Sequence, residues 1–171
     1  ACGVEERVTI RIGTLSKALG AMGGFVTGSS GLIDWLWNRV RTQIYSTALP
    51  PAICAAACAA LEIIQDEPER RRVLFERAEF LRNELSQRPH VTVPPSAGPI
   101  IPVILGDPGL TMRIASELKD VGFLVGAIRP PTVPEGTSRL RVSVTYAHQR
   151  DDLERFLKAL DRSLARIGKS G

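Results

Sequence analysis

Residues 14–24 read Thr-Leu-Ser-Lys-Ala-Leu-Gly-Ala-Met-Gly-Gly, a loop with one lysine, Lys17, among hydroxyl side chains and three glycines. The loop lies between two short apolar runs, residues 8–12 (VTIRI) and 24–27 (GFVT), which are typical of short buried strands. A lysine held between core strands can lose the water around its amine, and a desolvated amine is a nucleophile suited to Schiff-base chemistry with carbonyl compounds. A hairpin with an exposed lysine at its tip is the alternative, and this segment alone does not choose between the two.

The composition is typical of a soluble globular protein. Of the 171 residues, 44% are hydrophobic and 23% are charged, and the net charge is +4. These values fit one ordinary domain, or a small domain with part of another, and argue against general disorder. Because the arginines are spread over helical faces and are not grouped with aromatic residues, no nucleic-acid partner is expected. No apolar run reaches the roughly 18 residues that a membrane span needs, so no membrane partner is predicted.

The three cysteines, Cys2, Cys54 and Cys58, form no C-x-x-C pair. Cys54 and Cys58 are four residues apart in an alanine-rich run, so they share one helix face. With no histidine nearby, we expect small buried thiols and no metal site. No disulfide framework is implied, which predicts a reducing, cytoplasmic location.

The remaining chain alternates between helical and strand patterns. Helices are predicted at residues 32–41, 51–65, 69–87, 110–120 and 150–167. Strands are predicted at residues 100–105, 123–127 and 139–145, the last because RLRVSVT alternates strictly. Residues 44–51 (IYSTALPP) are expected to be extended, and residues 128–137 to form a proline-rich loop. We predict three regions: residues 1–50 with the lysine hairpin, bridging helices at 51–89, and a compact α+β domain at 90–171.

Three separated segments resemble the α-oxoamine synthases. They are TLSKALG at 14–20, YSTALPP at 45–51 and AIRPPTVPEGTSRLRVSVTYAH at 127–148, and the resemblance extends over residues 8–167 in the family's order and spacing. These enzymes use pyridoxal 5′-phosphate (PLP) to join an amino acid to an acyl thioester with loss of carbon dioxide. The resemblance implies an α/β fold, with the end of a fold-type-I PLP-transferase large domain followed by a C-terminal α+β small domain.

The resemblance also implies roles for particular residues. Lys17 matches the lysine that holds the cofactor and moves protons at the substrate α-carbon. Thr14 matches a phosphate-binding threonine. Ser46 and Thr47 match the segment that reaches the phosphate in the neighbouring subunit, which implies a homodimer with shared active sites; alternatively, the pair caps a turn. Arg129 matches the arginine that binds the amino-acid carboxylate, because a guanidinium grips a carboxylate bidentately; alternatively, it is a surface arginine.

Two weaker predictions concern other parts of the same motifs. The Gly23–Gly24 pair is expected to permit tight backbone approach near the cofactor. His148, at the end of the last strand, is expected to be a cap or a surface residue.

Residues 127–134 (AIRPPTVP) are most similar to the branch that makes 8-amino-7-oxononanoate for biotin synthesis. Its substrates are L-alanine and a pimeloyl thioester carried on coenzyme A or a carrier protein. Branches that use glycine to make 2-amino-3-oxobutyrate or 5-aminolevulinate are the alternatives. The family's carboxylate partner for the pyridine nitrogen lies upstream of the lysine and is absent from this sequence. We therefore expect the C-terminal part of a longer enzyme, inactive by itself, or else an interaction module without catalysis.

Overall fold

The chain divides into two compact units, Ala1–Pro68 and Glu69–Gly171. The structure, a computed structural model, describes residues 3–166, and each unit is described here by itself. The predicted division at residues 50 and 89 stays a prediction.

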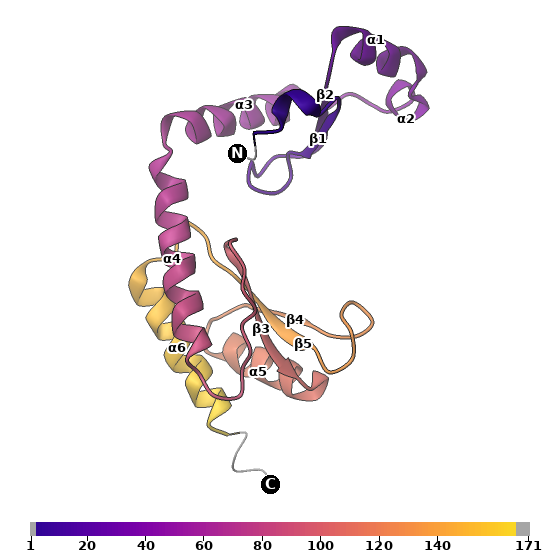
Figure 1. Ribbon diagram of the computed structural model, residues 1–171. Helices are drawn as coiled ribbons and strands as arrows, with labels where there is room; N and C mark the ends of the chain where they lie inside the picture. The colour runs from indigo at the N-terminus through magenta and orange to yellow at the C-terminus, as the bar shows by residue number, and fades with distance from the viewer. Residues whose placement is uncertain (1–2, 167–171) are drawn as a thin grey trace. The chain divides into compact units, whose positions relative to one another are not determined.

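The first unit contains a two-stranded hairpin and four helical segments (Figure 1). Its elements are η1 (Glu5–Arg7), β1 (Arg11–Thr14), β2 (Gly24–Thr27), α1 (Ser30–Arg39), α2 (Arg41–Ile44) and α3 (Pro51–Asp66). β1 and β2 are antiparallel, with Thr14 opposite Gly24. Local signals set the helix starts: the Ser29 side chain accepts a hydrogen bond from the Leu32 N–H, and Pro51 opens α3. The predicted helices at 32–41 and 51–65 are thus confirmed within one or two residues.

Burial in the first unit differs from the prediction. The first strand begins at Arg11 and not at Val8, and both strands are largely exposed, with Ile12 at 79%. The reason is that the described hairpin has only two strands, so no further strand or complete second layer seals its faces.

The cysteine prediction also needs correction. Cys54 and Cys58 are exposed, and the residue that α3 buries is Ala57. Cys2 lies outside the described residues.

The second unit is an α+β arrangement around an antiparallel three-stranded sheet of order β3-β5-β4. Its elements are α4 (Glu69–Ser86), β3 (Ile100–Gly106), α5 (Pro108–Asp120), β4 (Gly126–Ile128), β5 (Ser138–Ser143) and α6 (Arg150–Leu164). β5 buries Ser138, Leu140 and Val142 and leaves the residues between them more exposed, which confirms the predicted alternation. The helices therefore cover one face of the sheet (Figure 1).

Every element of the second unit except the short β4 contributes to its buried core. Leu81 of α4, Ile101 of β3, Ile114 of α5, Leu140 of β5 and Leu160 of α6 are fully buried together. This core fixes the loop between β4 and β5, which carries one of the candidate site residues.

Several predicted boundaries in this unit are displaced; for example, the strand predicted at 139–145 is β5, Ser138–Ser143. The strand predicted at 123–127 is β4, Gly126–Ile128, because the chain leaves α5 through Gly122 with a positive φ of 91° and then runs irregularly. The last helix ends at Leu164, and Ile167 of the predicted range lies outside the described residues.

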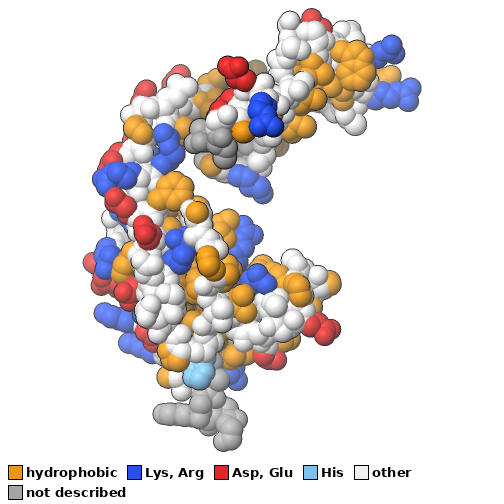
Figure 2. Space-filling view, in the orientation of Figure 1, with side chains coloured by type: hydrophobic (Ala, Val, Ile, Leu, Met, Phe, Trp, Pro, Cys, Tyr) orange, Lys and Arg blue, Asp and Glu red, His pale blue; other side chains and the backbone are white. Residues whose placement is uncertain are grey.

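Charged side chains are scattered over the face shown in Figure 2, with acidic and basic groups intermixed along the helices. Among the described residues, no helix is both long enough and apolar enough to cross a membrane.

Candidate active site

Lys17 lies in the connection between β1 and β2, and hydrogen bonds within that connection order its backbone. The Leu15 N–H donates to the Gly23 carbonyl (3.0 Å), and the Ala21 N–H donates to the Leu15 carbonyl (2.9 Å). The Lys17 carbonyl accepts from the Gly20 N–H (3.1 Å), so Lys17 opens a tight turn. Its side chain is exposed, as in the hairpin-tip alternative, and the desolvation expected of a lysine between core strands is not seen within the described residues.

A pair of hydroxyl groups lies beside Lys17 in the sequence. The Thr14 and Ser16 side-chain oxygens are 2.8 Å apart, and the Ser16 N–H donates to Thr14 Oγ1 (3.2 Å). Thr14 Oγ1 also lies 3.4 Å from the Gly23 carbonyl. Ser16 was not among the predicted site residues, although its place directly before the lysine was a usable signal. The two hydroxyls form a small donor group at the end of β1.

The glycine pair after the loop permits close packing. Gly23 has a φ of 99°, and a Cβ there would lie 2.7 Å from Leu49 Cδ1. A Cβ on Gly24 would lie 2.8 Å from the Gly13 carbonyl oxygen. A tight backbone approach is thus seen at Gly24, and Gly23 packs against the Leu49 side chain. The predicted place of this pair near the cofactor stays a prediction.

Ser46 and Thr47 precede Leu49 and are both exposed. The Ser46 hydroxyl donates to the Thr42 carbonyl at the end of α2. The alternative interpretation was that the pair caps a turn before Pro50; the bond seen for Ser46 runs back to α2 instead. The phosphate role of both residues stays a prediction.

Arg129 follows β4 in the second unit, at the start of the proline-rich loop. Its carbonyl accepts from the Thr132 N–H (3.0 Å), which folds the loop back. Its guanidinium is exposed, and Nη1 lies 3.0 Å from Met112 Sδ on α5. A guanidinium has five N–H donors, so this contact leaves donors available for a carboxylate.

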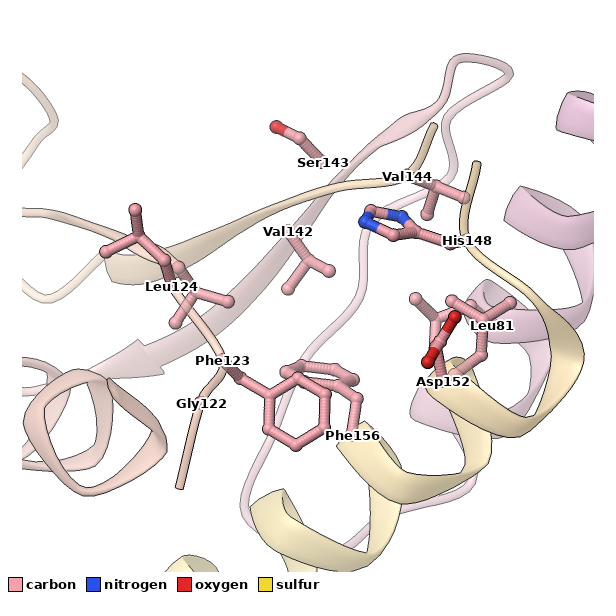
Figure 3. A pocket seen from close by; sticks show the side chains of 12 residues that line it. Leu81, Gly122, Phe123, Leu124, Val142, Ser143, Val144, His148, Asp152 and Phe156 are labelled. Carbon is pink, nitrogen blue, oxygen red and sulfur yellow. The ribbon is translucent and has the colours of Figure 1, made fainter. Parts of the chain in front are cut away.

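His148 caps the turn between β5 and α6, as predicted. Its Nδ1 accepts from the Thr145 N–H (3.1 Å). The imidazole borders an apolar cavity of about 240 Å³ whose wall includes Val142 and Phe156 (Figure 3). Asp152, on the same rim, accepts from the Gln149 N–H (2.8 Å). Both polar groups thus serve as caps at the edge of this cavity.

Comparison with known proteins identifies the family. Residues 1–160 match the class I and II aminotransferases. The chain belongs to this family.

Relatives and solved structures agree with that assignment. An 8-amino-7-oxononanoate synthase from Anaeromyxobacter dehalogenans (strain 2CP-1 / ATCC BAA-258) is 46% identical over 171 residues, which is 100% of this chain and 43% of that protein. Another, from Anaeromyxobacter sp. (strain K), is 48% identical over 94% of this chain and 40% of its own length. The chain thus spans less than half the length of these relatives. The predicted resemblance to this branch is confirmed.

Solved structures are similar to the chain as well. Sphingomonas wittichii serine palmitoyltransferase superposes with a TM-score of 0.91 at 26% identity, over 97% of this chain and 42% of that one. The 8-amino-7-oxononanoate synthase of Francisella tularensis gives a TM-score of 0.79 at 25% identity, over 92% of this chain and 46% of that one. Another solved neighbour is a serine palmitoyltransferase with a PLP internal aldimine, which gives a TM-score of 0.90. The predicted fold class, part of a fold-type-I PLP transferase, is confirmed.

The cofactor of this aminotransferase family is PLP, and the first unit offers groups that suit it. Lys17 supplies an exposed primary amine for the aldehyde. The Thr14 and Ser16 hydroxyls, 2.8 Å apart, suit phosphate oxygens. The groups of the hairpin therefore suit both the aldehyde and the phosphate of the cofactor.

Proposed function

We propose that the chain is part of a PLP-dependent acyltransferase that condenses L-alanine with a pimeloyl thioester, with decarboxylation, to give 8-amino-7-oxononanoate. One observation carries the proposal: the chain is 46% identical, over its whole length, to a protein of that name. The acyl carrier is either coenzyme A or a carrier protein, and the location is cytoplasmic.

The hairpin residues are assigned to the cofactor. When bound, PLP supplies an electron sink for the substrate α-carbon. Lys17 would hold the cofactor through its amine and then hold or move a proton at that carbon. The ordered turn at Lys17 supports this role, because it aims one amine from a fixed backbone. The Thr14 hydroxyl would donate to a phosphate oxygen.

The remaining roles concern phosphate and substrate. Ser46 and Thr47 would donate to the phosphate held by a second subunit, so the enzyme would act as a homodimer with shared active sites. For Ser46 this requires its hydroxyl to leave the Thr42 carbonyl. Arg129 would bind the L-alanine carboxylate through two parallel N–H donors and so orient the substituents on the α-carbon.

Chemical trapping on the chain tests the cofactor assignment. The chain is combined with the separately expressed upstream part of the Anaeromyxobacter dehalogenans relative, supplied with PLP and reduced with borohydride. Mass spectrometry should then find the cofactor on Lys17, and Lys17→Ala should remove the product entirely. Lys119→Ala, a change at an exposed lysine of α5, is the matched control and should leave the labelling intact. Equal labelling of several lysines, or none, would contradict the assignment.

The same assembly tests the carboxylate assignment. Arg129→Ala should keep the trapping on Lys17 and raise the L-alanine concentration needed for half-maximal turnover by tenfold or more, because a charge-assisted bidentate contact is lost. Arg113→Ala, at another exposed arginine of the same unit, should change little. An Arg129→Ala assembly with unaltered L-alanine dependence would remove the role.

A further inference from the structure

The side chain of Arg129 has a thioether as its neighbour. Nη1 lies 3.0 Å from Met112 Sδ, and no other hydrogen bond or ion pair of this guanidinium is seen among residues 3–166. Thioether sulfur is a weak acceptor. Such a contact orients the guanidinium but is weak, so a stronger acceptor such as a carboxylate can replace the sulfur.

Met112 is also open to small oxidants. It lies on α5, and 44% of its surface is exposed. Thioethers are converted by peroxide to sulfoxides, a change that is reversible by reductases. The position that contacts Arg129 is therefore also a reachable redox site.

We propose that Met112 is an oxidative modification site that controls the availability of Arg129, a role that rests on the carboxylate function proposed above. The sulfur lone pair attacks one oxygen of hydrogen peroxide, an S–O bond forms and the O–O bond breaks. Sulfur loses two electrons, and the other peroxide oxygen leaves as water after taking up the protons. No further reactant is needed.

The product differs from the thioether in hydrogen bonding. A sulfoxide oxygen is polar and a strong acceptor, and it would stand at the position where Arg129 already points. The guanidinium then bonds to a group of its own chain. A substrate carboxylate must displace that bond, so oxidation lowers the affinity for the amino acid by about tenfold.

The chain contains a matched internal control. Its other methionine, Met22, is exposed to a similar degree, 52%, and lies in the hairpin connection of the first unit. Within the described part of the chain, Met22 makes no hydrogen bond to an arginine. Both methionines should oxidise, but only the oxidation of Met112 should change the hydrogen bonding of the Arg129 guanidinium.

The experiment uses the full chain labelled with ¹⁵N, with the methionine methyl groups labelled with ¹³C. Hydrogen peroxide is added in steps, mass spectrometry follows each sulfoxide, and NMR follows the Arg129 Nε–Hε signal, assigned by its loss in Arg129→Ala. The signal should shift in step with oxidation of Met112. It should shift equally in Met22→Leu protein and stay still in Met112→Leu protein, in which a side chain of similar volume replaces the sulfur. Methionine sulfoxide reductase should restore the original position.

Two results would overturn the proposal. One is complete oxidation of Met112 with an unmoved Arg129 signal; the other is an equal shift in Met112→Leu protein. Titration with L-alanine separates the proposal from the function on which it rests. If L-alanine, added to the assembly with the upstream part and PLP described above, moves the Arg129 signal in neither redox state, the carboxylate role of Arg129 fails, while the shift on oxidation still decides the coupling.

Discussion

At Lys17 the backbone and the side chain are controlled by different parts of the molecule. The turn is held by hydrogen bonds from within its own loop, such as that from the Gly20 N–H. The amine is exposed and therefore hydrated. Activation as a nucleophile therefore requires groups that cover the amine, beyond the hairpin itself. The neighbouring hydroxyls of Thr14 and Ser16 are already paired with one another and are preorganised.

Asp152 provides a residue-level prediction that depends on pH. The Gln149 N–H and then the Arg155 guanidinium donate to its carboxylate, and together they lower the pKa of Asp152 below its ordinary range. A carboxyl with a depressed folded pKa stabilises the protein above its unfolded pKa, and this contribution is lost as pH falls through the folded pKa. Asp152→Asn should therefore lower the free energy of unfolding at neutral pH, and the difference should shrink as the pH drops below about 4.

Urea unfolding at a series of pH values measures this difference. Asp151→Asn changes an exposed neighbour that has no side-chain hydrogen bond or ion pair among the described residues, and it should have little effect at any pH. A constant difference between Asp152→Asn and the parent from neutral to acid pH would show that the charge does not carry the effect.

At the level of elements, α6 packs against the core of the second unit along most of its length. Its apolar residues Leu153, Phe156 and Leu160 recur at helical spacing and face the core. On another side, Arg88 of the chain after α4 donates to Asp161 (2.9 Å). The helix is thus held by a broad apolar face and by one pairing at its edge, of which the apolar face contributes the larger share.

Truncation of Leu160 tests this view of α6. The side chain is fully buried, so Leu160→Ala should lower the free energy of unfolding by about 2–5 kcal/mol, through lost burial and a new cavity. Leu124→Ala is the control, because Leu124 is 87% exposed and its loss should cost less than about 0.5 kcal/mol. Equal effects of the two changes in urea unfolding would contradict the packing.

At the scale of the whole chain, the two units differ in how they bury apolar surface. The described core cluster lies entirely within the second unit. In the first unit, large apolar side chains such as Ile12, Trp37 and Tyr45 are exposed. An open apolar groove of about 530 Å³ runs between the hairpin and α1–α2. Figure 2 shows hydrophobic side chains gathered over this region, as is typical of surfaces that contact other protein.

Hydrogen exchange should report the same difference. Amides of Ile101 and Leu140, within the core sheet, should exchange at least about 100-fold more slowly than those of Ile12 and Val26 in the hairpin, because opening the hairpin exposes little additional apolar surface. Mass spectrometry or NMR of the 171-residue chain measures both sets in one sample. Equal protection of hairpin and core amides would show that the two units unfold together.

Much of this molecule follows from patterns a few residues long. The cap at Ser29, the proline start of α3 at Pro51 and the alternation that makes β5 are local, because capping and periodicity involve only near neighbours. The three motifs at 14–20, 45–51 and 127–148, read together, likewise pointed to the family without any knowledge of packing.

Tertiary structure decided what those elements touch. The exposure of Cys54 and the contact between Arg129 and Met112 were not predictable from local pattern. Burial and contacts depend on which surfaces meet, and residues 112 and 129 meet only because the sheet brings β4 beside α5. The sequence by itself determined the order of the elements and the family; only the folded chain determined which side chains are covered and which acceptor the Arg129 guanidinium contacts.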